Sequence, residues 1–414
     1  MIRISAIASL LLNIALAAPV HGATPALVEI HVGSEKLQGK VVARSDHQLW
    51  LVGQDGRMRL LTAQETAKQQ QVSPQFHGWT VSVLRDSLRR EFGKEFDVAG
   101  TRHYAVCAHG DQKARAYAET FEDLFRTFQM YFSVRGFKIN EPEFPLVAVI
   151  FPDYDAFARY AQADKVQPSR TLRGYYHPAS NRVALYETRE GSQQSFLAPG
   201  VDLRSRQFRM NLETGDFSLP PAEVGGGGRI PGQTFPHPFQ FADHTAWGAV
   251  EGTLKDTMIH EATHQVAFNT GLHSRIGECP KWVVEGLATV FEAPGIRSSN
   301  AGPAVKNRIN RERFLWFGNY AKARRKPKSL EAFLSNDDLF KSAVLDGYSE
   351  AWAFSFFLIE TRPRPYADYL RTVASRDPLQ AYPPAERVAD FKKTVSSDLP
   401  LLEADFLRFI AGIK

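Results

Sequence analysis

Long apolar segments and a strong excess of either charge are missing from most of this chain. Beyond the N-terminal segment, no apolar run reaches the roughly 18 residues that a transmembrane helix needs, so we expect no membrane span. The 50 Lys and Arg residues nearly balance the 45 Asp and Glu residues, which leaves a net charge of +5. This excess is too small to indicate nucleic acid as a partner, and no base-reading motif is present. The composition therefore predicts a soluble globular protein.

The N-terminus is the exception to the shortage of apolar runs. Residues 4–18 are apolar apart from Ser and Asn, follow Arg3, and precede a short segment of mostly small residues. The run is too short to span a membrane and is typical of a Sec signal peptide, here covering residues 1–22. We therefore expect a periplasmic or secreted protein, with a retained membrane anchor as the alternative.

Cysteine is also scarce, because the chain has only Cys107 and Cys279. Export would place both in an oxidising compartment, where they can form a disulfide. Such a bond would tie the region after residue 271 to the N-terminal half of the core. The alternative is two separate thiols, with Cys107 buried in a strand.

The sequence His-Glu-Ala-Thr-His that starts at His260 is the most informative segment of the chain. Positions i and i+4 of a helix project from one face, so His260 and His264 can bind one metal ion. Glu261 lies one position round, where its carboxylate can reach a metal-bound water without binding the metal. Apolar residues recur at helical spacing from about residue 247, and Gly271 is a stop signal, so we predict a helix here.

A third metal ligand is predicted at Glu285, which lies 21 positions after His264. A catalytic zinc site has three protein ligands and one open position, and two imidazoles with a carboxylate suit it. Glu285 belongs to a second amphipathic run that ends near Glu292, with Pro280 suited to its start. Two antiparallel helices would bring the three side chains together. The alternative is an ordinary solvated helix face with a surface ion pair.

These motifs resemble those of the gluzincins, the thermolysin-like zinc metallopeptidases, in which His-Glu-x-x-His is paired with a Glu on a following helix. A closer similarity is to the bacterial family known as domain of unknown function 1570, carried by residues 174–178, 260–265 and 280–289. The similarity extends from about residue 115 to residue 358. It implies a two-lobed zincin fold and hydrolysis of peptide bonds.

The resemblance also implies roles for individual residues. It makes His260, His264 and Glu285 the ligands of one Zn²⁺ ion per chain, and Glu261 the general base. The segment Gly-Tyr-Ser-Glu-Ala-Trp-Ala around Tyr348 resembles the gluzincin segment whose Tyr donates to the oxyanion of the intermediate. A phenol suits that role because it is a strong neutral donor. The alternative for Tyr348 is a buried aromatic whose hydroxyl caps a backbone group.

The chain departs from related patterns at two places. Thermolysin has an Asp four residues after its ligand Glu to orient an imidazole, whereas this chain has Thr289, and Glu292 is a candidate substitute. The metzincin pattern would require Gly and His at positions 267 and 270, where the chain has Ala267 and Thr270. His273 is nearby but does not match that pattern, which makes it a weak candidate ligand.

We predict an α+β protein with a gluzincin-type two-lobed fold preceded by a small β module. Short alternating strands at residues 24–66 indicate an SH3-like module, which serves either packing or substrate binding, and a polar linker follows to residue 71. Residues 80–190 form the N-terminal α+β lobe. Residues 191–246 are a Gly- and Pro-rich insertion typical of a lid, a binding loop or a mobile linker, and its position before the zinc-site helix favours a lid. Residues 247–414 carry the zinc-site helices and a helical lobe.

By the same resemblance, the strand at residues 181–186 is the edge strand that flanks the active-site cleft. Val183, Ala184 and Leu185 would then hydrogen-bond an extended peptide as an added strand. The alternative is an ordinary outer strand of the sheet.

The sequence thus predicts an exported zinc-dependent metallopeptidase that acts on peptides or proteins, with possible association with the cell envelope. The alternative function is a cell-envelope peptide-binding protein on a peptidase scaffold, with a structural or vestigial zinc. The presence of Glu261 favours hydrolysis, because a structural zinc site needs no base and normally fills its fourth position with protein.

Overall fold

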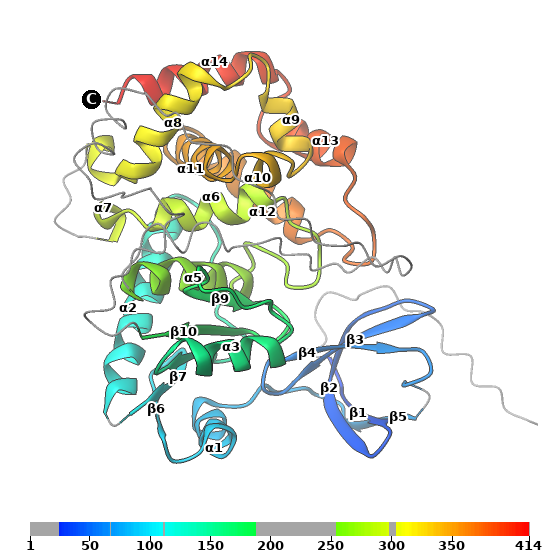
Figure 1. The fold of residues 1–414 in the computed structure, drawn as a ribbon. Coiled ribbons are helices and arrows are strands. Elements are labelled where there is room, and N and C mark those ends of the chain that lie inside the picture. Colours follow the sequence, from blue (N-terminus) through cyan, green and yellow to red (C-terminus); the bar gives the residue numbers. More distant parts are fainter. Residues whose placement is uncertain (1–24, 67, 111, 188–253, 298–303, 414) are drawn as a thin grey trace, which may run out of the picture.

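The computed structural model describes residues 25–66, 68–110, 112–187, 254–297 and 304–413. It is an α+β structure, as predicted, with two β-sheets in the N-terminal half and a helical C-terminal half (Figure 1). The predicted signal peptide and the predicted lid insertion both lie outside the described residues. Among the helices that are described, none is long and apolar enough to cross a membrane.

The first sheet is a five-stranded antiparallel module at the N-terminus, with strand order β4-β3-β2-β1-β5. Its strands are β1 (Leu27–Val32), β2 (Glu35–Arg44), β3 (Gln48–Gly53), β4 (Met58–Thr62) and β5 (Gln69–Ser73). The predicted linker is wrong in part, because β5 pairs with β1 and extends the module to Ser73. The residues of β5 are mostly polar and exposed. The strand therefore lacks the alternation of apolar and polar residues that would have indicated it in the sequence.

This N-terminal module packs directly against the rest of the protein. Trp50 and Met58 form a buried apolar cluster with Phe76 and Phe144, and the partly buried side chains of Ile276 and Leu379 pack against it. The guanidinium of Arg275 donates to the carbonyls of Gly56 in the module and of Pro178 in a turn between two strands of the second sheet, at 2.7 Å each. These contacts favour the packing role over an independently moving binding domain.

The second sheet is mixed, with strand order β6-β7-β8-β10-β9. Its strands are β6 (Phe96–Gly100), β7 (Tyr104–His109), β8 (Leu146–Phe151), β9 (Gly174–His177) and β10 (Arg182–Tyr186). β7, β8 and β10 are parallel, whereas β6 and β9 are antiparallel edge strands. Helices α1 (Val81–Phe92) and α3 (Tyr154–Ala163) cover one face of the sheet. Helices α2 (Lys113–Ser133) and α5 (Leu254–Asn269) cover the other face.

The predicted edge strand is wrong, because β10 lies inside the sheet. It pairs with β8 on one side and with β9 on the other, and Val183, Ala184 and Leu185 are fully buried. Their backbone groups are therefore not free to bind a peptide. An unbroken apolar run is typical of a strand covered on both faces, which is what β10 is. The edge on this side of the sheet is the short strand β9.

The predicted disulfide is also wrong, because Cys107 and Cys279 are both free thiols. Cys107 on β7 faces the apolar cluster under α1 and α3, whereas Cys279 packs against the cluster on the opposite side of the sheet. Desolvation raises the pKa of Cys107 to about 12 and that of Cys279 to about 11, so both thiols are protonated and unreactive near neutral pH.

The helical half is built around α11 (Val344–Thr361), which is buried along almost its whole length. It packs against α6, α8, α10, α12 and α14. The other helices of the described residues are α5 (Leu254–Asn269), α6 (Lys281–Phe291), α7 (Pro294–Arg297), the 3-10 helix η2 (Val305–Arg308), α8 (Arg311–Ala323), α9 (Leu330–Ser335), α10 (Leu339–Ser342), α12 (Pro363–Ala374), α13 (Pro384–Thr394) and α14 (Leu399–Ala411). In Figure 1, α5 and α6 lie between the mixed sheet and this helical half.

A buried ion-pair cluster in the helical half should make the protein sensitive to loss of its one cation. Arg325 is ion-paired with Glu350 at 2.8 Å and with Glu403, and all three side chains are at most 9% exposed. Replacing Arg325 by Met would leave two buried carboxylates without their cation, so we expect a loss of about 3–5 kcal/mol in the free energy of unfolding. Chemical denaturation monitored by circular dichroism measures this loss.

The matched control is Arg371→Met, which removes a guanidinium from an exposed pair with Asp368. That change should alter the free energy of unfolding by no more than about 0.5 kcal/mol. If the two substitutions lowered the free energy of unfolding equally, burial of the ion pairs would not increase the contribution of Arg325 to stability.

Candidate metal centre

Helices α5 and α6 bring together the three side chains predicted as metal ligands. Nε2 of His260 lies 3.0 Å from Nε2 of His264, and Oε2 of Glu285 lies 3.4 Å and 3.6 Å from these two atoms. Among the described residues, this is the one cluster of three or more His, Cys, Asp or Glu side chains whose ligand atoms converge. His264 is 4% exposed and Glu285 is 1% exposed, so the cluster is not a solvated surface ion pair.

The spacing of the three atoms fits a tetrahedral zinc ion. Metal–ligand distances of about 2.0–2.1 Å place tetrahedral ligand atoms about 3.3–3.4 Å apart. The observed separations of 3.0, 3.4 and 3.6 Å lie around that value. Two imidazole nitrogens and one carboxylate oxygen also form a donor set that catalytic zinc sites use, with the fourth position left for water or substrate.

Local sequence explains how the two helices come this close. Gly271 has φ +90° just after α5, so it ends the helix in the left-handed conformation predicted for it. Gly286 follows Glu285 and faces α11, where an added Cβ would lie 2.6 Å from the carbonyl oxygen of Ala351 and still closer to Ser355 Oγ. The Glu-Gly pair in α6 therefore combines a ligand with the close helix contact that holds it in place.

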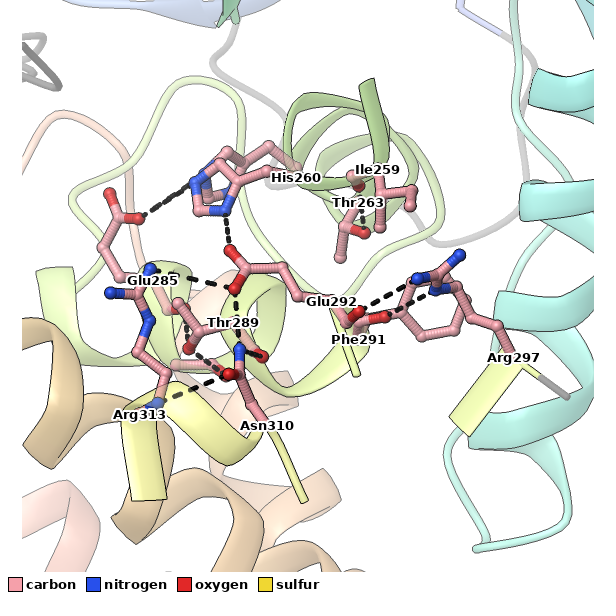
Figure 2. Close-up of polar contacts among 12 residues, drawn as sticks. Ile259, His260, Thr263, Glu285, Thr289, Phe291, Glu292, Arg297, Asn310 and Arg313 are labelled. Carbon is pink, nitrogen blue, oxygen red and sulfur yellow. Dashed lines mark hydrogen bonds and ion pairs between the residues drawn. The ribbon is translucent and has the colours of Figure 1, made fainter. Parts of the chain in front are cut away.

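Glu292 contacts the first histidine, in the orienting role for which the sequence made it a candidate in place of the Asp of thermolysin. Nδ1 of His260 lies 2.6 Å from Oε1 of Glu292, so the Nδ1–H donates to the carboxylate and Nε2 keeps its lone pair for a metal (Figure 2). Thr289 instead donates from Oγ1 to the carbonyl of Glu285 at 2.6 Å. Desolvation alone would raise the pKa of Glu292, but the charge of Arg313 and the bond to His260 outweigh it and lower that pKa.

Glu261 lies beside the cluster and is held by the edge strand β9. Its Oε2 accepts a hydrogen bond from the backbone N–H of Tyr176 at 2.7 Å, and the side chain is 5% exposed. Desolvation raises the pKa of Glu261, and this effect exceeds the opposing attraction of His260 and His264. A carboxylate with a raised pKa is better matched to accepting a proton near neutral pH than an ordinary one.

Tyr348 projects from α11 toward the same centre. The residue is 2% exposed and hydrogen-bonds to Glu285. Desolvation, followed by the negative charge of Glu285, raises its pKa well above the usual value, so the phenol remains a neutral donor. The structure thus places Tyr348 with the predicted ligands rather than in a separate core position.

The sequence analysis did not find three groups that contact the acidic residues around the candidate metal centre. They are the N–H of Tyr176, which contacts Glu261, and the side chains of Asn310 and Arg313, which contact Glu292. Asn310 shows a helix-capping signal, since its Oδ1 accepts from the N–H of Arg313 at 3.4 Å, but no local pattern reveals its second contact. His273 is not part of the ligand cluster. It packs against Phe268, and desolvation lowers its pKa to about 3.

The fold and the site together define an α+β protein with a candidate His-His-Glu metal centre between two helices. Residues 255–380 match the model of a family described as protein of unknown function (DUF1570). This match supports the family similarity drawn from the sequence, and it includes all three candidate ligands, Glu261 and Tyr348. No curated protein matches the chain.

Proposed function

We propose that this protein is an exported zinc-dependent metallopeptidase of the gluzincin type. The observation that carries the proposal is the convergence of His260, His264 and Glu285 beside a buried carboxylate that is not one of the three. The order of a mixed sheet, an antiparallel edge strand next to α5 and a helical half supports the same class. A site built only for structure would not need Glu261 in this position.

In the proposed reaction, the two histidines and Glu285 hold the zinc ion. When bound, zinc lowers the pKa of a water molecule toward neutrality and polarises the substrate carbonyl. Glu261 takes the proton from the attacking water and passes it to the leaving amine. Tyr348 donates from its hydroxyl to the oxygen that becomes negative in the tetrahedral intermediate. The nucleophile comes from water, so no covalent acyl-enzyme forms.

Among the described strands, β9 is the edge of the mixed sheet that contacts the proposed base, and we propose that an extended peptide binds along it. It is the edge of the mixed sheet, it packs beside α5, and its Tyr176 N–H already contacts the proposed base. A peptide that adds to this edge would have its backbone close to Glu261. We therefore assign to β9 the role that the sequence had suggested for residues 183–185.

The direct test is to incubate the exported, zinc-reconstituted protein with a diverse peptide library and to identify products by mass spectrometry. Glu261→Gln is analysed beside it. Cleavage by the wild type alone would support the proposal and report the specificity. If neither cleaves although one zinc is bound per chain, the proposal of hydrolysis fails and a peptide-binding role is favoured.

Replacing Tyr348 by Phe should lower kcat by about 10²–10³-fold, because one donor to the oxyanion is lost. The aromatic ring keeps its packing, but the hydrogen bond from the hydroxyl to Glu285 is lost and zinc binding should weaken with it. The variants are therefore compared at saturating zinc, where KM should change little. Steady-state kinetics on a peptide identified by the library measure the split. Tyr320→Phe is the control, since Tyr320 donates to Glu350 at 3.0 Å, not to a predicted ligand. A kcat unchanged in Tyr348→Phe would remove Tyr348 from the reaction.

A further inference from the structure

Arg313 is a fully buried cation next to the candidate metal centre. It lies in the first turn of α8, three residues after the capping residue Asn310, and is 1% exposed. Figure 2 shows its guanidinium reaching toward Glu292, with His260 on the other side of that carboxylate. α8 therefore brings a positive charge from a third helix into contact with the outer shell of the site.

The two oxygens of Glu292 have separate tasks. Oε1 accepts from His260 at 2.6 Å, whereas Oε2 accepts from Nδ2 of Asn310 at 2.8 Å and lies 3.7 Å from Nη2 of Arg313. Asn310 also donates from Nδ2 to the carbonyl of Thr289 at 3.1 Å, which ties the start of α8 to α6. Asn310 and Arg313 thus fix Oε2 of Glu292, while Oε1 faces the imidazole of His260.

Arg313 also contacts Tyr348, the proposed hydrogen-bond donor to the oxyanion. Its guanidinium carbon lies 5.6 Å from the ring centroid of Tyr348, within the range of a cation–π interaction. A buried guanidinium loses several kcal/mol of hydration, and an apolar side chain of similar volume would avoid that loss. The presence of a cation here is explained if its charge and planar shape orient Glu292 and Tyr348.

We propose that Asn310 and Arg313 form a positioning unit for the metal centre. The unit holds Glu292 in the orientation that directs Nε2 of His260 toward the metal, and Arg313 supports the ring of Tyr348. Neither residue is one of the three converging candidate ligands. The effect on zinc binding depends on the candidate metal centre, and the effect through Tyr348 rests in addition on the proposed hydrolysis.

The test measures zinc affinity by competition with a chelator in wild type, Arg313→Met and Arg311→Met. Groups that hydrogen-bond a zinc ligand typically contribute about 10–100-fold to zinc affinity. Arg313 contacts Glu292 rather than a ligand, so we expect Arg313→Met to weaken zinc binding by about 10-fold, the lower end of that range. Arg311 precedes it in α8 and is exposed, so Arg311→Met should match the wild type. Wild-type affinity in Arg313→Met would overturn the proposal.

A double-mutant cycle separates positioning from a general loss of structure. If Arg313 acts through Glu292, Arg313→Met should weaken zinc binding little further in a Glu292→Gln background. Fully additive losses would contradict the proposal. If Arg313→Met does not fold, Arg313→Lys keeps the charge without the planar fork and replaces it in the same cycle. Zinc binding without peptide cleavage in the wild type would reject the hydrolytic function, while the cycle would still decide on the positioning unit.

Discussion

Glu261→Gln should lower kcat/KM for peptide cleavage by about 10²–10⁴-fold, the usual contribution of a general base. The amide has nearly the same shape and can still accept the hydrogen bond from the N–H of Tyr176, which is 2.7 Å from Glu261 in the native protein. It cannot accept a proton from water at neutral pH. The expected loss is therefore one of chemistry, measured by steady-state kinetics on a peptide that the wild type cleaves.

Zinc content distinguishes this explanation from damage to the site. Glu261 is not one of the three converging ligands, so Glu261→Gln should still bind one zinc per chain, as determined by elemental analysis. Undiminished cleavage in the variant would show that Glu261 is not the base. Loss of zinc together with activity would instead make Glu261 a contributor to metal binding.

The second large effect is expected for Glu285→Ala. Loss of a group that only contacts a zinc ligand weakens zinc binding by up to about 100-fold, and loss of the ligand Glu285 itself should weaken it by more. The substitution removes the only anionic ligand of the proposed set and leaves two neutral imidazoles. Stabilisation by bound metal follows mass action, so a native site with zinc at 1,000 times its dissociation constant gains about 4 kcal/mol. Glu285→Ala should lose most of that zinc-dependent rise in thermal midpoint.

Calorimetric melts with zinc and with a chelator measure this difference. Glu119→Ala, which removes an exposed carboxylate paired with Arg115 on α2, is the control and should retain the full zinc-dependent rise. If Glu285→Ala binds zinc as tightly as the control, Glu285 is not a ligand. If the melting temperature of the wild type does not respond to zinc, the metal centre itself is called into question.

Local patterns predicted α5 and α6 well. The His-Glu-x-x-His spacing places two imidazoles on one face of any α-helix, and Gly271 and Pro280 bound the loop between the helices as their conformational preferences require. Residues 146–151 form a uniformly apolar run, and they form a central strand buried on both faces. In each case the information lies within a few neighbouring residues.

The errors came from contacts that local sequence does not encode. Apolar residues 183–185 suit a strand, but only the pairing of β10 with both β8 and β9 shows that it is not the edge. Cys107 and Cys279 suit a disulfide by their number, yet they lie in apolar clusters on opposite faces of the sheet. The polar side chains of β5 predict a linker, whereas its backbone pairing with β1 makes it a strand.

The sequence by itself determined the chemistry available at the centre: two imidazoles one helical turn apart, a neighbouring carboxylate and a third ligand on the next helix. Only the tertiary structure decided what supports it, because β9, Asn310 and Arg313 reach the site through packing between distant segments. Tyr176 meets Glu261 across 85 residues, and Glu292 meets His260 across 32. Helix geometry is a property of short segments, whereas the position of a supporting side chain depends on how whole layers pack together.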